Sequence, residues 1–135
     1  MGAFDMMNIA GSGMAMHQSW LDMLSYNISN VNTARRTSDT AFQAQYAIAQ
    51  SVEGPEGGEG VRTSGIALGD PEGKVVYQPD NALADADGNV RMPDIDLGSQ
   101  MSQLIMAQRG FQAQSSVLRN AQDIYSSALS IGKQS

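Results

Sequence analysis

The chain has 135 residues and carries 8 Lys and Arg against 14 Asp and Glu, a formal net charge of −6, so it has the size of one domain or of one domain with an insertion. The acidic balance has the wrong sign for a protein that binds a nucleic-acid backbone, and the absence of Cys with a single His excludes disulfides, thiolate catalysis and the usual zinc sites. No apolar run approaches the roughly 20 residues of a membrane span and the N-terminus lacks the pattern of a secretory signal, which by themselves favour a soluble cytosolic protein.

The charged residues are distributed unevenly along the chain. Residues 35–96 hold 16 of them, whereas residues 1–34 hold two and residues 97–135 hold four. The middle of the chain is therefore expected to be the solvated part. We predict a discontinuous domain of residues 1–34 and 97–135 that carries residues 35–96 as an insertion.

The first segment has the periodicity of a long helix. Mostly apolar residues recur at alternating steps of three and four in two adjacent stripes, so the apolar face is wider than one helical partner would cover. We expect neighbouring copies to cover the part that a single partner leaves open. The stripes are Met6, Ile9, Gly13, Met16, Trp20, Met23 and Asn27, and then Ala10, Met14, His17, Leu21, Leu24, Ile28 and Val31.

The middle segment combines glycine-rich turns with short strands. Residues 53–60 are mostly Gly and Glu, which predicts a flexible loop in a segment with too few apolar residues for a core. Residues 42–48 suit a strand or a helix. Residues 73–77 and 89–92 have strand composition, and Asp87-Gly88 between them is typical of a hairpin turn.

The last segment repeats the helical pattern over five heptads, with Asp94 or Asp96 as N-cap and Gly132 as the expected stop. The fold class is therefore mainly α with a small β insertion, the two terminal helices pairing as an antiparallel coiled coil. One stripe is mostly large and apolar, and the other has smaller residues that let a second backbone approach. They are Leu97, Met101, Leu104, Gln108, Phe111, Ser115, Leu118, Gln122, Tyr125 and Leu129, and then Ala107, Gly110, Gln114, Val117, Ala121, Ile124, Ala128 and Ile131.

Two constellations bear on catalysis or metal binding. Asp85, Asp87, Asn89 and Asp96 faintly resemble a calcium loop, but the required glycine is replaced by Val and Pro93 interrupts the loop, so an Asp-Gly turn is favoured. His17 has no carboxylate one helical turn away to orient it, which indicates a packed or interfacial side chain. We predict no catalytic residue, no cofactor and no metal.

Three motifs resemble those of the flagellar axial proteins, which build the rod, hook and filament junctions of the bacterial flagellum. Ser25 to Thr33 resembles their Asn-rich N-terminal motif, Tyr77 to Ile95 is similar to the signature of the rod members, and Arg109-Gly-Phe-Gln-Ala resembles the core of their last helix.

The resemblance implies a non-enzymatic subunit of the proximal rod of the basal body, exported by the flagellar type III apparatus without a cleaved signal and working outside the inner membrane. Its partners would be other rod proteins, further copies of itself and the proteins at the junction of rod and membrane ring, with no nucleic acid, membrane insertion or small-molecule substrate. We expect the helices to form the wall of a torque-transmitting tube and export channel. The expected packing and assembly residues are Met16, Trp20, Leu24, Asn27, Ile28, Asn30, Val31, Leu104, Arg109, Phe111, Leu118, Tyr125 and Leu129.

Two alternative functions are compatible with the same sequence. A soluble helical-hairpin adaptor or export chaperone with a flexible acidic insert accounts for the same stripes, and it requires both helices to be stable in the monomer. A calcium-dependent module or enzyme would use Asp85, Asp87 and Asp96, and it requires calcium binding at millimolar concentration.

Overall fold

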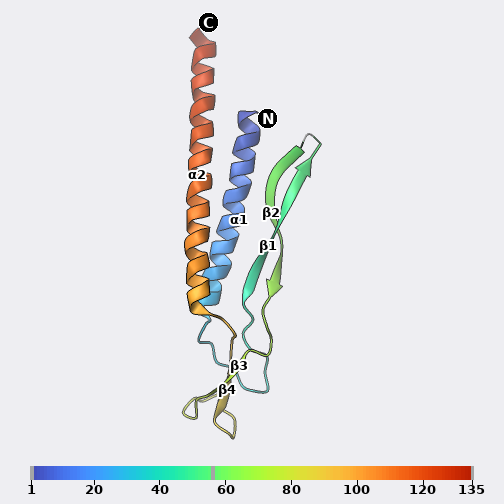
Figure 1. Ribbon diagram of the computed structural model, residues 1–135, viewed down its shortest axis with the longest axis vertical. Helices are drawn as coiled ribbons and strands as arrows, with labels where there is room; N and C mark the ends of the chain where they lie inside the picture. The colour runs from blue at the N-terminus through green and yellow to red at the C-terminus, as the bar shows by residue number, and fades with distance from the viewer. Residues whose placement is uncertain (1, 56, 135) are drawn as a thin grey trace.

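The computed structural model describes residues 2–55 and 57–134. Two long helices run side by side in opposite directions, and two small antiparallel sheets come between them in the chain (Figure 1). The predicted fold class, mainly α with a small β insertion, is confirmed. The elements in chain order are α1 (Ala3–Ser29), β1 (Gln45–Gly54), β2 (Gly57–Leu68), β3 (Lys74–Tyr77), β4 (Asn89–Met92) and α2 (Leu97–Gln134).

An Asp side chain accepts a backbone hydrogen bond at the N-terminus of each helix. The Asp5 side chain accepts a 2.7 Å hydrogen bond from the Gly2 backbone N–H, and the Asp96 side chain accepts one of 2.9 Å from the Ser99 backbone N–H. These contacts satisfy free N–H groups and place negative charge at the positive end of each helix dipole. Asp96, and not Asp94, is thus the N-cap of α2. Gly132 does not end α2, which continues to Gln134, so that prediction was wrong.

The predicted loop at residues 53–60 instead contains the ends of two paired strands: residues 53–54 lie in β1 and residues 57–60 in β2, while Glu56 lies outside the described residues. β1 and β2 pair from Gln45 opposite Leu68 at the base to Gly54 opposite Gly57 at the tip, with register shifts after Ile48 and after Val52. Gly60 has φ +127°, a conformation that favours glycine, and its backbone passes closely over Ser12 of α1. The glycines of this segment therefore allow a twisted, bulged ribbon to lie against a helix.

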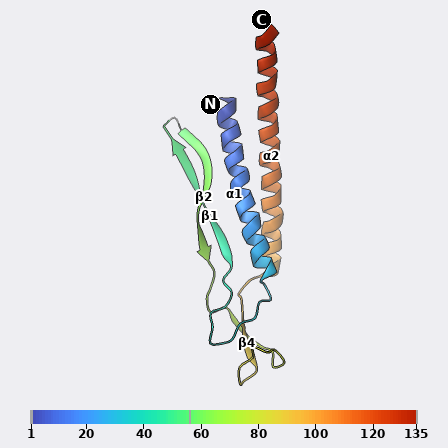
Figure 2. The ribbon, with the colours of Figure 1, turned by 180° about the vertical axis from the view of Figure 1, so that it is seen from behind.

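The hairpin covers the face of α1 that points away from α2, as both views show (Figure 1, Figure 2). The Val61 backbone N–H donates a 3.0 Å hydrogen bond to the Ser12 hydroxyl, and Gln45 at the base of β1 is bound to Asn27. α1 is thus the middle layer of three. The expectation that neighbouring copies cover the part of α1 that α2 leaves open was wrong on this side, because a segment of the same chain lies there.

A smaller unit lies beyond the end of the helices. β3 and β4 form an antiparallel pair, and a core of Phe42, Ala44 and Ile95 with Val31 joins this region to the end of α1. The middle segment therefore does bury apolar side chains, contrary to expectation. Residues 78–88 connect the two strands, so Asp87-Gly88 is not a two-residue hairpin loop. It closes a local turn in which the Gly88 N–H donates to the Asp85 carbonyl at 3.0 Å, with Gly88 at φ +78°.

Candidate functional site

From Leu104 to Tyr125, the seam between α1 and α2 takes alternate residues from the two stripes predicted for α2, and Gln100, which belongs to neither stripe, extends it by one position. Eight positions spaced by four and three residues are buried or half-buried along its length. A helix that packs on one partner buries a line between two adjacent stripes, because the partner lies over the groove that separates them. These positions are Gln100, Leu104, Ala107, Phe111, Gln114, Leu118, Ala121 and Tyr125.

Two glycines bring the helices close together. A Cβ at Gly110 would overlap the His17 imidazole, and a Cβ at Gly13 would lie 2.9 Å from the amide of Gln114. Each helix thus supplies one glycine and one polar side chain that fills the space above the other helix's glycine. His17 Nδ1 is 2.8 Å from the Gly13 carbonyl, so its ring is fixed in the seam and serves packing.

Asn27 joins three elements at the lower end of the seam. It is fully buried. Its Nδ2 donates to the Gln45 carbonyl at 2.9 Å and to Gln100 Oε1 at 3.0 Å, and its Oδ1 accepts the Gln45 backbone N–H at 2.8 Å. Gln100 is also buried. A buried, satisfied amide of this kind fixes the relative positions of α1, β1 and α2, because a shift of any one would leave polar groups unpaired.

At the other end of the seam α2 is longer than α1. The ring of Phe4 packs edge-on against that of Tyr125, with centroids 4.9 Å apart. Phe4 lies in the first turn of α1, whereas α2 continues for nine residues beyond Tyr125, and its C-terminal end projects past the N-terminus of α1 (Figure 1). The last turns of α2 consequently have no α1 residue beside them.

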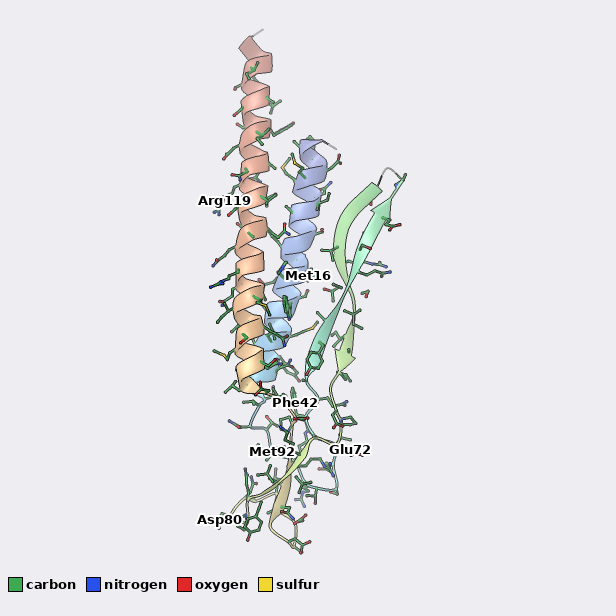
Figure 3. The ribbon with its side chains drawn as sticks, in the orientation of Figure 1. Met16, Phe42, Glu72, Asp80, Met92 and Arg119 are labelled. Atoms are coloured by element: carbon green, nitrogen blue, oxygen red, sulfur yellow. The ribbon has the colours of Figure 1, made fainter. Side chains whose placement is uncertain are left out.

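The outer surface of α2 is rich in exposed apolar side chains. Ile124 is 60% exposed and Ile131 is 70% exposed. The helix carries four charged residues, far fewer than a solvated face of this length would normally hold. Figure 3 shows Arg119 on its outer side. The exposed large apolar residues of α2 are Leu97, Met101, Ile105, Met106, Val117, Ile124, Leu129 and Ile131.

The predicted packing residues fall into three groups, and their part in assembly remains a prediction. Leu24 and Asn27 are buried. Arg109 and Leu129 are exposed, Leu129 because it lies beyond the end of α1. The half-buried residues are Met16, Trp20, Ile28, Asn30, Val31, Leu104, Phe111, Leu118 and Tyr125.

That set omitted residues on which the seam depends. Ala10, Gln100, Ala107 and Ala121 are buried there, and Gly110 accommodates His17. The regular spacing of small residues in the second α2 stripe is the signal that could have found most of them. Nothing in the sequence points to the backbone of Gln45 as the partner of Asn27.

The carboxylate proposed for calcium binding is held by the protein itself. Asp85 Oδ1 accepts the backbone N–H groups of Asp87 and Asn89 at 3.0 and 2.9 Å, and its Oδ2 accepts the Thr37 hydroxyl at 2.9 Å. The Asn89 and Thr37 hydrogen bonds are the main reason why the pKa of Asp85 is lowered. Among residues 2–55 and 57–134, no group of three or more acidic or His side chains is arranged to hold a metal ion.

Asp85→Asn is expected to reduce stability in a pH-dependent way. Because the pKa is lowered in the folded state, the charged carboxylate stabilises the fold above the ordinary pKa of an Asp, and this contribution is lost as the pH falls through the lowered pKa. The melting temperature of the variant, followed by circular dichroism, should therefore lie below that of the parent at neutral pH and approach it at acidic pH. Asp87→Asn is the matched control. A constant difference between parent and Asp85→Asn at all pH values would contradict this account.

Comparison with known proteins finds relatives that are similar along nearly the whole chain. A family model described as the C-terminal part of flagellar basal body rod FlgEFG proteins matches residues 86–131, which include β4 and most of α2. The flagellar basal-body rod protein FlgC of Yersinia enterocolitica is 30% identical over 135 residues, covering 98% of this chain and all of the relative. The chain belongs to the FlgC family of flagellar basal-body rod proteins. FlgC of Salmonella typhimurium is 28% identical over 134 residues, and that of Borreliella burgdorferi 30% over 149.

Membership of the FlgC family confirms the resemblance seen in the sequence. The protein is a structural rod subunit of the flagellar basal body, which implies assembly with other rod components. Within the part of the chain that the structure describes, neither helix has the length and hydropathy that crossing a membrane requires.

Proposed function

We propose that this chain is a non-enzymatic subunit of the proximal rod, and that its terminal helices stand in the wall of a tube that transmits torque and encloses an export channel. The observation that carries the proposal is the exposed apolar surface of α2. Helix α1 covers one side of α2, and the hairpin covers the far side of α1. Among residues 2–55 and 57–134, no other element lies over Val117, Ile124 or Ile131. Burial of these side chains against neighbouring subunits supplies an assembly energy without any catalytic group.

The proposal includes the partners and the route of the protein. Further copies of the same chain and other rod proteins cover the apolar surface of α2, and proteins at the junction of rod and membrane ring bind elsewhere. The subunit works outside the inner membrane after export by the flagellar type III apparatus, without nucleic acid, membrane insertion, cofactor or small-molecule substrate. Residues 1–34 and 97–135 form the wall domain, and residues 35–96 form the insertion on it. The packing residues named from the sequence belong to this wall.

A wall of packed helices distributes twisting force over many contacts. Each side chain packed between two helices contributes little by itself, and a dense interface resists shear because the side chains interdigitate. The half-buried residues Met16 and Trp20 of α1 and Phe111 and Leu118 of α2 are the candidates for this role, since each is partly accessible in the single chain.

Ile124→Asp is expected to abolish rod assembly and swimming while the single chain stays folded. Ile124 is 60% exposed, so the substitution removes little intramolecular packing, and its effect on unfolding should stay within about 0.5 kcal/mol. In an assembled wall it would place a charge in a dry contact, which is strongly unfavourable. Swimming in soft agar, with the variant as the sole copy, and recovery of the protein in isolated basal bodies are the measurements.

Ala86→Asp is the matched control, because it adds the same charge at an exposed position outside the helices. It should swim normally. Normal swimming by Ile124→Asp would remove the basis of the proposal. Hydrogen exchange on the dilute chain distinguishes a rod subunit from an adaptor or chaperone. The adaptor or chaperone would be favoured if both helices were strongly protected without partners and the Ile124→Asp strain swam normally.

A further inference from the structure

The edge of β3 that faces away from β4 has backbone groups that are unpaired among the described residues. The alternation of hydrogen bonds in the small sheet shows which residues carry them. Arg91 of β4 exchanges backbone hydrogen bonds with Arg35, at 2.8 and 2.9 Å, on the side of β4 away from β3. Successive residues of an antiparallel strand direct their backbone groups to opposite sides. The neighbours of Arg91 therefore point toward β3, and Val90 stands opposite Val76 as a hydrogen-bonded pair.

The same alternation continues along β3. The Gln78 backbone N–H donates to the Gly88 carbonyl at 2.8 Å. Gln78 is two residues after Val76, so both direct their backbone groups toward β4. Val75 and Tyr77 lie at the intervening positions. Their N–H and C=O groups consequently point away from β4, and no backbone bond to them occurs in the part of the chain that the structure describes.

The side chains at these positions are apolar and exposed. Val75 is 59% exposed and Tyr77 is 69% exposed, whereas Val90 on the opposite face of the sheet is fully buried. Free backbone groups beside exposed apolar side chains are the arrangement on which an added strand pairs, through main-chain hydrogen bonds and alternate side chains.

The usual protection of a sheet edge is weak here. Lysine on an edge strand normally deters pairing. Lys74 instead forms a 2.6 Å ion pair with Asp94, and that contact raises the pKa of Lys74. Pro79 occupies the next outward-pointing position after Tyr77 and has no N–H, so it limits an added strand to a few residues without covering the edge.

Charge determines which strand fits. Glu72 precedes β3 and Asp80 follows it, both are exposed, and the two labels stand at opposite ends of the β3–β4 unit (Figure 3). Neither forms an ion pair within residues 2–55 and 57–134. If two copies of β3 paired antiparallel with Val75 opposite Tyr77, Glu72 would face Asp80 twice. A second copy is thus disfavoured, whereas positive residues at both ends of a partner strand would complement the flanks.

We propose that the free edge of β3 is a docking site for a short extended segment of a partner protein that carries basic residues at both ends of an apolar core. The partner adds a third strand beside β3, bonds to the backbone of Val75 and Tyr77, and places its cations near Glu72 and Asp80. The site lies away from the helices, so it does not depend on the assembly surface of α2. The short pairing predicts a weak contact that becomes effective when many subunits are arrayed.

The test uses the full chain labelled with ¹⁵N and two synthetic peptides, acetyl-Arg-Thr-Thr-Val-Thr-Val-Thr-Thr-Lys-amide and the same peptide with Glu in both charged positions. The basic peptide is expected to bind with a Kd below about 1 mM and to shift the amide resonances of Val75 and Tyr77. The acidic peptide should bind at least tenfold more weakly. Val75→Pro should abolish binding of the basic peptide while leaving β3 paired, because the proline removes an N–H that β4 does not use.

A second variant tests the proposal even if Val75→Pro fails to fold. Val75→Lys adds a like charge against the basic peptide and should weaken binding at least tenfold. Leu68→Lys is its control, since Leu68 is also 59% exposed but lies on β2. The proposal is overturned if the basic peptide fails to bind at millimolar concentration, if it binds Val75→Lys as well as the parent, or if both peptides bind equally. It is also overturned if Val75 and Tyr77 resonances depend on protein concentration alone, which would identify a second copy.

Discussion

Replacing Asn27 by Ala is expected to lower the free energy of unfolding by about 2 to 5 kcal/mol. The substitution removes three hydrogen bonds at once and leaves the Gln45 N–H, the Gln45 carbonyl and the Gln100 amide oxygen without their partner. The space vacated by a fully buried side chain adds to the cost. Urea unfolding at low protein concentration, followed by circular dichroism, measures the effect.

The control for this experiment is Asn32→Ala. Asn32 belongs to the same Asn-rich motif but is exposed, so its replacement should change stability by less than about 0.5 kcal/mol. A double-mutant cycle with Gln100→Ala should give a coupling energy of about 1 to 3 kcal/mol, because the two amides share a buried bond. Equal small effects of Asn27→Ala and Asn32→Ala would show that Asn27 does not hold the three elements together.

Gly110→Ala is expected to destabilise the protein by about 1 to 3 kcal/mol, although Ala is the better helix former by about 1 kcal/mol. The added methyl group would occupy the place of the His17 ring, which is fixed by its hydrogen bond to the Gly13 carbonyl. Relief requires the ring to turn out of the seam or the helices to separate. Thermal melting and near-ultraviolet circular dichroism, which senses the neighbouring Trp20, would report the change.

Two other glycines provide matched controls. Gly11→Ala places its methyl group in open space on α1 and should stabilise the protein by up to about 1 kcal/mol. Gly13→Ala meets only the flexible end of Gln114 and should have a smaller cost than Gly110→Ala. Combining Gly110→Ala with His17→Ala should recover part of the stability. If Gly110→Ala behaves like Gly11→Ala, the close approach at His17 is not a feature of the folded protein.

The sequence by itself determined the two helices and the strands near 74–77 and 89–92. Helical periodicity and strand alternation are local properties, so stripes such as the one through Leu24 and the one through Asn27 can be identified without knowledge of the partner. Three motifs also indicated the family, which the comparison with known proteins confirmed. The candidate packing residues came from the same stripes, and their role in assembly is still a prediction.

Only the tertiary structure decided what lies against each stripe. The glycine-rich segment around residues 53–60 has few apolar side chains, so nothing local distinguishes a loop from a ribbon that is paired with β1 and laid on α1. Likewise Asn27 binds the backbone of Gln45, a partner that any residue type could provide. The seam of α2 runs between its two stripes because α1 approaches over small residues such as Gly110. These features depend on contacts between distant segments, and such pairings follow from how the whole chain packs and not from the pattern of any one element.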